Sequence, residues 1–220
     1  MRASAARALA LFDLDGTITR HDTLLPYLSG YLRQGRPRLR RLMQVLPALG
    51  RFALGRDRGE LKAAWISAIL GGRTRAELDA WTARFVPRLI RHGLIADALA
   101  AIEAHRSAGD HLVLLSASPD LYVPAIGRAL GFAEVLCTGV EWNGDHLSGR
   151  LATPNRRGPE KARCLEALRR QHGALPVVAY GNAAGDLEHL ALADRGVLVN
   201  GSPRARRRAA RLRIACATWR

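Results

Sequence analysis

The feature that most constrains this chain is a series of short apolar runs, each of which stops at a turn of small or polar residues. The first run spans residues 6–12, and four more lie at 111–115, 134–138, 176–180 and 196–199. Segments between them carry apolar residues at helical spacing, at 96–107, 119–130, 159–172 and 186–193. Alternating buried strands and helices predict an α/β fold, a doubly wound parallel sheet with helices on both faces. Its ligands should bind beyond the carboxyl ends of the strands.

One interval, from about residue 23 to 93, breaks the alternation because it contains helical patterns only. These patterns span residues 24–32, 37–54, 59–70 and 75–90. Such an insertion after the first strand predicts an α-helical cap over the strand ends. We therefore expect a core of residues 1–20 and 95–220 and a cap of residues 21–94. Residues 140–153, with Asn143-Gly144 in their middle, predict a β-hairpin within the core.

The net charge is strongly positive, since 34 basic and 19 acidic residues give +15, and only Lys62 and Lys161 are lysines. Residues 204–220 hold seven arginines and no acid. This charge favours anionic partners in general. A dedicated nucleic-acid surface is disfavoured, because no aromatic side chains accompany the arginines. The arginine-rich tail, 204–213, is expected to be a solvated terminal helix or a contact with nucleic acid or membrane.

Cysteine use and hydropathy indicate a cytoplasmic protein. Cys137, Cys164 and Cys216 are widely spaced and form no zinc-binding or disulfide pattern. The amino terminus does not fit a signal peptide, and no run of 18 uncharged apolar residues is present. We expect a cytoplasmic protein, with contact to a membrane surface left open and the oligomeric state undetermined.

The first strand ends in Asp13-Leu14-Asp15-Gly16-Thr17. Both carboxylates reach the same pocket, where a divalent cation would relieve their repulsion. One can then attack an electrophile while the other transfers a proton. The alternative is an acidic loop that caps the following helix.

Three later segments also place polar residues at strand ends. In 116–119, Ser118 is expected to cap a helix that begins at Pro119, so that Ser116 and backbone N–H groups can bind an anion. Lys161 lies in the first turn of a helix, where a cation opposes the helix dipole, and this indicates an anionic partner in the pocket. The alternative for Lys161 is a surface pair with Glu160.

The last of these segments, residues 180–186, is a glycine-containing turn that follows a strand. Asn182 and Asp186 can offer oxygen ligands there. The alternative is a plain turn in which Asp186 is the N-cap of the next helix.

Together, these four motifs resemble the haloacid dehalogenase superfamily, and within it the phosphoserine-phosphatase-like branch with a helical cap. The resemblance implies that Asp13 is the nucleophile that becomes an aspartyl-phosphate, and that Asp15 is the general acid and base. It implies that Ser116 and Lys161 hold the phosphoryl oxygens. It assigns Mg²⁺ to Asp13, the backbone carbonyl of Asp15 and the side chain of Asn182, with Asp186 either binding the metal itself or supporting its ligands. Gly16, Thr17, Asp22 and Ala117 would lie on the substrate side.

The fourth motif departs from the family pattern, which begins Gly-Asp, because here it reads Gly181-Asn182. An amide oxygen still ligates a hard cation, but one formal charge is lost, and weaker Mg²⁺ binding is expected. Asp22 matches in position an acidic residue of the phosphoserine phosphatases, although Asp22-Thr23 is equally a helix N-cap, which is the reading we prefer.

The functional hypothesis is a Mg²⁺-dependent phosphatase for a small soluble phosphomonoester such as phosphoserine. A rival is a lipid-phosphate phosphatase at the membrane surface, motivated by an apolar stripe with arginines in residues 36–54. That stripe is more often the core of a helical cap. A rival of another class is a phosphate- or nucleic-acid-binding module without turnover, motivated by Asn182 and the basic tail. Because no motif lies after Val199, deletion of residues 204–220 is expected to leave hydrolysis nearly intact.

Overall fold

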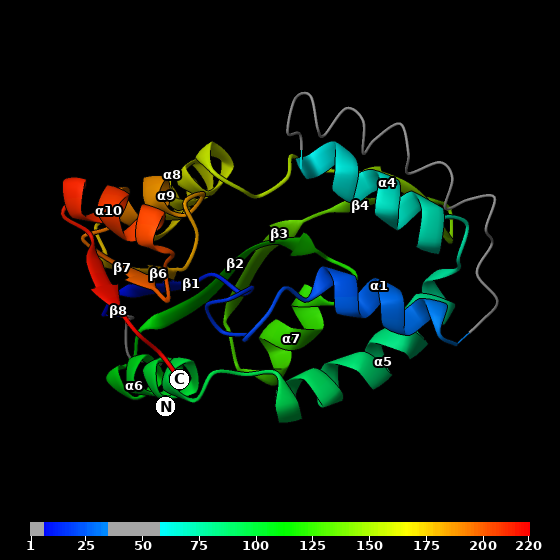
Figure 1. Cartoon of the computed structure of the whole chain (residues 1–220), viewed down its shortest axis with the longest axis horizontal. Helices are drawn as coiled ribbons and strands as arrows, with labels where there is room; N and C mark the ends of the chain where they lie inside the picture. The colour runs from blue at the N-terminus through cyan, green and yellow to red at the C-terminus, as the bar shows by residue number, and fades with distance from the viewer. Residues whose placement is uncertain (1–6, 35–57) are drawn as a thin grey trace.

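The computed structural model describes residues 7–34 and 58–220, and its centre is a six-stranded sheet in which all neighbouring strands are parallel. The order is β3-β2-β1-β6-β7-β8, so the first strand lies inside the sheet (Figure 1). The strands are β1 (Leu9–Phe12), β2 (His111–Pro119), β3 (Glu134–Thr138), β6 (Val177–Gly181), β7 (Arg195–Val199) and β8 (Ala215–Ala217). The predicted doubly wound parallel sheet is confirmed.

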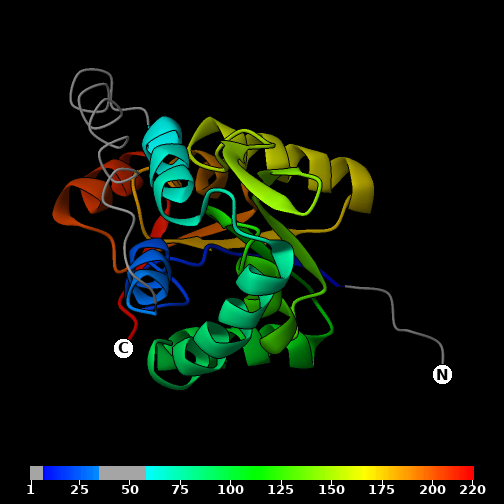
Figure 2. The same ribbon diagram turned by 90° about the vertical axis from the view of Figure 1, so that its right-hand side faces the viewer.

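Helices cover both faces of this sheet, which is why β1 is apolar at every position. Ala10 and Phe12 point into a core with α6 (Ala96–Ala108) and α7 (Val123–Ala129). Leu9 and Leu11 point into a second core on the opposite face. There they pack against α8 (Pro159–His172), α9 (Leu187–Leu192) and α10 (Pro203–Arg211). In the turned view, α8 lies on the other side of the sheet from α6 and α7 (Figure 2). The alternation of a strand's side chains thus serves two cores at once.

Three helices, α1 (Leu24–Leu32), α4 (Arg58–Leu70) and α5 (Arg75–His92), lie in the interval where an insertion was expected. Helix α5 begins with a capping box, in which Thr74 and Glu77 satisfy each other's backbone N–H groups. The rings of Tyr27 on α1 and Tyr122 at the start of α7 lie 4.5 Å apart between centroids. The insertion therefore shares a hydrophobic cluster with the core. The helix expected at 37–54, with its apolar stripe, lies outside the described residues.

The predicted hairpin is confirmed as β4 (Val140–Asn143) and β5 (His146–Leu151). Its turn uses Gly144, whose φ of 59° is in the left-handed region that favours glycine. The hairpin supports the insertion, because the Gly72 N–H donates to the Leu147 carbonyl at 2.8 Å. In the described part of the chain, no helix is long and apolar enough to cross a bilayer.

The structure corrects the expectation for residues 116–119. Strand β2 continues to Pro119, which pairs with Thr138 of β3 after a register shift, and helix α7 starts only at Val123 with Tyr122 as N-cap. Ser118 is therefore not a helix cap and Pro119 is not a first helical residue. The pairing with β3, which the local cap pattern does not reveal, prolongs the strand.

The arginine-rich tail is part of the core rather than a solvated appendage. Helix α10 buries Ala205 and Ala209 against the sheet, and β8 pairs with β7 as the sixth strand. Its arginines lie on the other face of α10, which is why the segment looks wholly polar in sequence. Deleting residues 204–220 would remove a strand and a helix from the fold. The expectation that hydrolysis survives this deletion stays a prediction.

Candidate active site

The candidate site lies where β1, β2 and β6 end, at the carboxyl edge of the sheet. A cavity of about 660 Å³ opens there, between the sheet and helices α1 and α4 of the insertion. The core contributes Asp13, Asp15, Gly16, Ala117, Ser118, Asn155, Arg157, Lys161, Asn182, Ala183 and Asp186 to its lining. The residues after β1 and the insertion contribute Arg20, His21, Asp22, Leu24, Leu25, Arg58, Leu61, Lys62 and Trp65. Segments far apart in sequence thus meet in one cavity.

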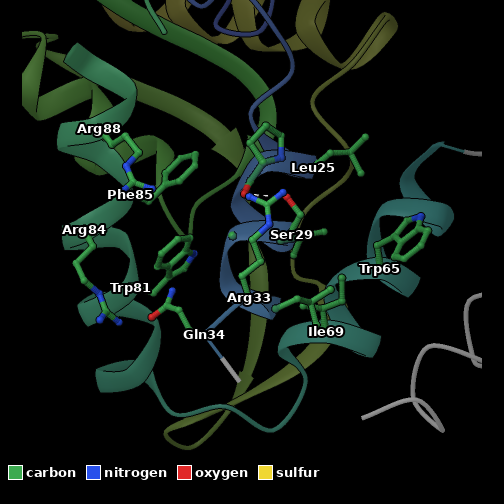
Figure 3. Close-up of a pocket in the computed structure, with 14 residues that line it drawn as sticks. Leu25, Ser29, Arg33, Gln34, Trp65, Ile69, Trp81, Arg84, Phe85 and Arg88 are labelled. Atoms are coloured by element: carbon green, nitrogen blue, oxygen red, sulfur yellow. Dashed lines mark hydrogen bonds between the residues drawn. The ribbon is translucent and has the colours of Figure 1, made fainter. Parts of the chain in front are cut away.

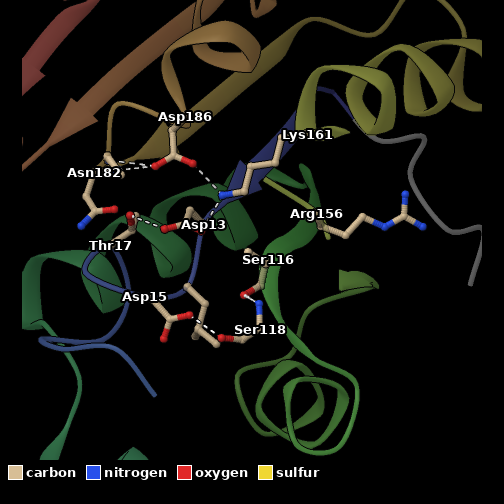
Figure 4. A network of polar contacts seen from close by, with 12 residues as sticks. Asp13, Asp15, Thr17, Ser116, Ser118, Arg156, Lys161, Asn182 and Asp186 are labelled. Atoms are coloured by element: carbon tan, nitrogen blue, oxygen red, sulfur yellow. Dashed lines mark hydrogen bonds and ion pairs between the residues drawn. The ribbon is translucent and has the colours of Figure 1, made fainter. Parts of the chain in front are cut away.

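Asp13 follows the last residue of β1 and is only 6% exposed. Its Oδ1 accepts a hydrogen bond from Lys161 Nζ at 2.6 Å, and its Oδ2 accepts one from Thr17 Oγ1 at 3.0 Å (Figure 4). Burial raises the pKa of Asp13 to about 7, against the opposing pull of Lys161. The carboxylate is held at both oxygens and faces the cavity.

Lys161 reaches the site from the first turn of α8, and 2% of the residue is exposed. Its Nζ also donates to Asp186 Oδ1 at 2.7 Å, so one ammonium joins two carboxylates. Burial lowers the pKa of Lys161, but Asp13 and Asp186 outweigh burial and the net shift is upward. The surface pairing with Glu160 considered above is wrong, and the anionic partners of Lys161 are Asp13 and Asp186.

Asp15 is fixed by groups from two other segments. Its Oδ1 accepts hydrogen bonds from the N–H and the hydroxyl of Thr23, both at 2.7 Å, and its Oδ2 accepts one from Ser118 Oγ at 2.6 Å. Burial raises the pKa of Asp15, while the hydrogen bonds from Ser118 and Thr23 oppose the rise. The side chain therefore has a defined orientation beside Asp13 (Figure 4).

The turn after β6 comes close to the first motif because two glycines leave room for it. A Cβ on Gly16, whose φ is +79°, would lie 2.0 Å from Asn182 Nδ2, and one on Gly181 would lie 2.6 Å from the Cβ of Asp186. Asp186 Oδ2 accepts the backbone N–H groups of Asn182 and Ala183 at 3.1 and 2.8 Å. Asp186 thus shapes the turn that carries Asn182.

The donor set fits a hard cation. The Asp13 carboxylate, the Asp15 carbonyl and the Asn182 amide oxygen are the types of ligand that Mg²⁺ prefers. Both carboxylate oxygens of Asp186 already accept hydrogen bonds, one from Lys161 and one from the turn. Through these bonds, Asp186 positions both Lys161 and the turn that carries Asn182.

Ser116 is fully buried, and its Oγ accepts the Ser118 N–H at 3.0 Å. Neither Ser116 nor Thr17 lines the cavity, whereas Gly16 and Ala117 do. The hydroxyl of Ser116 keeps its own proton free to donate. In this structure, Ser116 is buried and does not reach the surface of the cavity.

Asp22 lines the cavity and also caps a helix. Its Oδ1 accepts the N–H groups of Leu24 and Leu25 at 2.9 and 3.3 Å. The preferred reading of Asp22 as a helix cap agrees with these bonds.

Several residues of this cavity were missed by the sequence reasoning, among them Lys62 and Asn155. Lys62 projects from α4, and its Nζ donates to the Ala117 carbonyl and to Asn155 Oδ1, the latter at 2.5 Å. Burial lowers the pKa of Lys62 to about 8, although Asp15 and Asp22 oppose the shift. The scarcity of lysine, which drew attention to Lys161, is a signal that applies equally to Lys62.

Residues 10–191 match the model of the haloacid dehalogenase-like hydrolase family. The chain belongs to this family. Among curated relatives of this hydrolase, protein CicA of Caulobacter vibrioides is 34% identical over 191 residues, which are 84% of this chain and 83% of CicA. Phosphoserine phosphatase SerB1 of Mycobacterium tuberculosis is 26% identical over 205 residues, 90% of this chain and 67% of SerB1.

Solved structures resemble the hydrolase over nearly its full length. A Bordetella pertussis protein described as of unknown function has a TM-score of 0.82 and 24% identity, covering 96% of this chain and 98% of its own. A phosphoserine phosphatase solved as a phospho-aspartyl intermediate analogue has a TM-score of 0.67 and 16% identity, covering 97% and 93%. At such identities these structures support the fold alone. The predicted superfamily and fold are confirmed, and with them the prediction of an enzyme, a hydrolase of the haloacid dehalogenase type.

Proposed function

We propose that this hydrolase cleaves a small phosphomonoester through a phosphorylated Asp13, with Mg²⁺ as cofactor. The observation that carries the proposal is the buried ion triad, in which Lys161 joins Asp13 and Asp186 at the rim of a cavity. Buried charges are costly, and an arrangement of two carboxylates and one ammonium persists where it serves a further partner. A phosphate dianion with a divalent cation is a partner that complements this triad.

The chemistry follows from the placement of the two aspartates. An Asp13 oxygen attacks phosphorus, the bond from phosphorus to the leaving oxygen breaks, and Asp15 gives that oxygen its proton. A water then attacks the phosphorus of the aspartyl-phosphate, Asp15 takes the proton of that water, and the bond to Asp13 breaks. The bonds from Thr23 and Ser118 support this role, because they hold the Asp15 carboxyl in one orientation for both transfers.

Positive groups stabilise the charge that the phosphoryl oxygens carry during transfer. Lys161 is preorganised by its two carboxylate partners, so little reorganisation is needed at the moment of reaction. Mg²⁺ held by Asp13, the Asp15 carbonyl and Asn182 would supply further charge neutralisation. Because Asn182 provides a neutral amide in place of a carboxylate, we expect this site to bind Mg²⁺ more weakly.

The cavity supports a leaving group that carries an anionic substituent, as phosphoserine does. Four cationic side chains line it besides Lys161, namely Arg20, Arg58, Lys62 and Arg157. Lys62 is partly buried and bonds to Ala117 and Asn155, two acceptors that an anionic group would replace. A relative named phosphoserine phosphatase agrees with this substrate class.

A second candidate, a phosphomonoester with an apolar tail, is favoured by a neighbouring cavity of about 880 Å³ (Figure 3). This cavity lies between α1, α4 and α5, and it shares Leu25 and Trp65 with the first one. Its wall includes Trp81, Phe85 and Ile69, with arginines among them. A lipid phosphate could place its headgroup at Asp13 and its chain along this wall.

The experiment that tests the proposal is a screen of amino-acid, sugar, nucleotide and lipid phosphates with and without Mg²⁺. We expect Mg²⁺-dependent phosphate release with the wild type, none with Asp13→Asn, and acid-stable trapping of phosphate on Asp13 by rapid quench. The non-enzymatic alternative, a phosphate- or nucleic-acid-binding module, would instead bind these anions without release at any Mg²⁺ concentration. That result would overturn the proposal.

A substitution at Leu25 distinguishes the two substrate classes. Leu25 is 61% exposed and lines both cavities. If the tail follows the apolar wall, Leu25→Asp lowers kcat/KM for a long-chain alkyl phosphate and spares a short one. Leu99→Asp, an exposed leucine on α6, is the matched control. Equal activity of the wild type and Leu25→Asp on both chain lengths would retire the lipid-phosphate candidate.

A further inference from the structure

A second cluster of metal-binding side chains lies at the opposite edge of the sheet from Asp13. His111 is the first residue of β2, Glu134 is the first residue of β3, and His172 is the last residue of α8. Because the strands are parallel, their amino ends meet at one edge, while the catalytic residues follow their carboxyl ends. Ser116 lies five positions after His111, which is roughly 16 Å along β2. The cluster is thus separate from the site already described.

The three side chains converge on one point. His111 Nε2 lies 3.4 Å from Glu134 Oε2, and His172 Nε2 lies 3.2 Å from the same oxygen. The two imidazole rings lie side by side, with centroids 4.6 Å apart and planes at 44°. One potential ligand atom from each residue lies within 4.8 Å of the other two. Each side chain is partly exposed, at 25% for His111, 21% for Glu134 and 18% for His172, so the point is reachable from solvent.

We propose that His111, Glu134 and His172 form a zinc-binding site. Two imidazoles and one carboxylate are a ligand set suited to Zn²⁺, and zinc–ligand bonds of about 2.0–2.2 Å in a tetrahedron place neighbouring ligand atoms about 3.3–3.6 Å apart. The two measured separations, 3.4 and 3.2 Å, are close to those tetrahedral edges. The ligand atoms of the two imidazoles lie within 4.8 Å of each other, and rotation of the partly exposed His172 ring at the helix end can bring them into that range.

The ligand types also disfavour Mg²⁺ at this cluster. Mg²⁺ prefers all-oxygen sites and retains its waters, so two imidazoles make this cluster a poor magnesium site. With three protein ligands, a fourth position stays open to water. The ion would tie together the starts of two strands and the end of α8, three segments that are separated in sequence by 23 and 38 residues. Zinc should therefore stabilise the fold.

The test uses the full-length protein without a tag, freed of metal by chelation. Excess Mg²⁺ is then added to occupy the candidate catalytic site, so that the zinc titration reports on the histidine cluster. Zinc is added in a calorimetric titration and in thermal unfolding. We expect one equivalent of Zn²⁺ to bind and to raise Tm, and we expect His111→Gln and His172→Gln each to weaken binding by about tenfold or more, since even outer partners of metal ligands matter that much. Substituted Co²⁺ should give the intense visible absorption of a tetrahedral site.

His92→Gln is the matched control, because His92 is exposed at the end of α5 and belongs to no such cluster among the residues that the structure describes. It should bind Zn²⁺ as the wild type does. Circular dichroism and turnover in zinc-free buffer show whether the two cluster variants are folded, since neither residue touches the catalytic cavity. The proposal is overturned if the wild type binds no zinc in excess Mg²⁺, or if both cluster variants bind it as tightly as His92→Gln. The three residues would then be a plain hydrogen-bonded cluster.

Discussion

The two walls of the candidate catalytic cavity, one formed by the core and one by the helical insertion, differ in how deeply their groups are buried and fixed. On the core wall, Asp13, Lys161 and Asp186 are at most 6% exposed, and each holds at least two hydrogen bonds. On the insertion wall, Leu25 is 61% exposed, and Lys62 makes bonds that a ligand can replace. The core wall is therefore buried and fixed before a substrate arrives, whereas the insertion wall is more exposed, although Lys62 also makes two hydrogen bonds.

This difference separates chemistry from selection. Groups that stabilise developing charge are effective when they are already oriented, because no reorganisation accompanies the reaction. Groups that choose a leaving group gain from being adjustable, since their contacts vary with the substrate. Substitutions on the core wall should therefore change kcat or the fold itself, whereas substitutions on the insertion wall should change KM.

The largest effect is expected for Asp13→Asn. Loss of the nucleophile should lower kcat on the order of a thousandfold or more, because the covalent route then disappears. The variant should remain folded, since an amide at this position still accepts a hydrogen bond from Lys161. Phosphate release from the best substrate of the screen measures the effect. Activity within tenfold of the wild type would mean that the core wall is not the reaction centre.

The next largest effect is expected for Lys161→Met. Removal of the ammonium leaves the carboxylates of Asp13 and Asp186 buried and uncompensated, a change that typically costs about 3–5 kcal/mol of unfolding free energy. Urea denaturation of the metal-free protein measures it. Lys62→Met is the matched control on the insertion wall and should cost far less. Equal costs for the two variants would erase the contrast between the walls.

The sequence was sufficient to predict the sheet, the helical insertion and the four motifs, because each depends on local patterns. A buried strand is apolar at every position, and the polar turn at its carboxyl end follows directly, as at Asp13 and Asn182. The elements that the sequence did not predict depend on pairing between distant segments. Strand β8 is three residues long and follows a helix dense in arginine, so only its pairing with β7 identifies it. The extension of β2 to Pro119 depends in the same way on β3.

The site shows the same limit at the level of side chains. Asp13, Asp15, Asn182 and Lys161 share a cavity as expected, since all lie near strand ends at one edge of the sheet. Lys62 could not be placed from sequence, because its position depends on how α4 packs against the hairpin and the core. Likewise, the bonds from Thr23 and Ser118 to Asp15 join residues separated by 8 and 103 positions. Such partners become visible only in three dimensions.

The substitution Lys62→Met tests whether the insertion wall selects the leaving group. If Lys62 contacts an anionic group on the leaving group, its loss should raise KM by roughly tenfold, as for a hydrogen bond to a charged partner, and leave kcat nearly unchanged. Steady-state kinetics with two substrates, one with a carboxylate on the leaving group and one without, separate the effects. A rise in KM that is equal for both substrates would show that Lys62 does not contact the carboxylate of the leaving group.

The pH dependence follows from the same residue. Burial lowers the pKa of Lys62 to about 8, so its positive charge is present below that pH and is lost as the pH rises through it. KM for the carboxylate-bearing substrate should therefore rise above about pH 8 in the wild type. Lys62→Arg should keep KM flat in this range, because a guanidinium remains charged. A parallel rise in the arginine variant would assign the pH dependence to another group.

The smallest effect is expected for Asn182→Asp, which restores a charge at the core wall. A carboxylate in place of the amide adds one formal charge to the oxygen ligands, so half-maximal activity should need severalfold less Mg²⁺. Asn143→Asp, at the exposed hairpin turn, adds the same charge away from the cavity and controls for net charge. The assay is phosphate release as a function of Mg²⁺ concentration. An unchanged Mg²⁺ requirement in Asn182→Asp would remove this side chain from the cation site and leave only Asp13 and the Asp15 carbonyl as its ligands from the core wall.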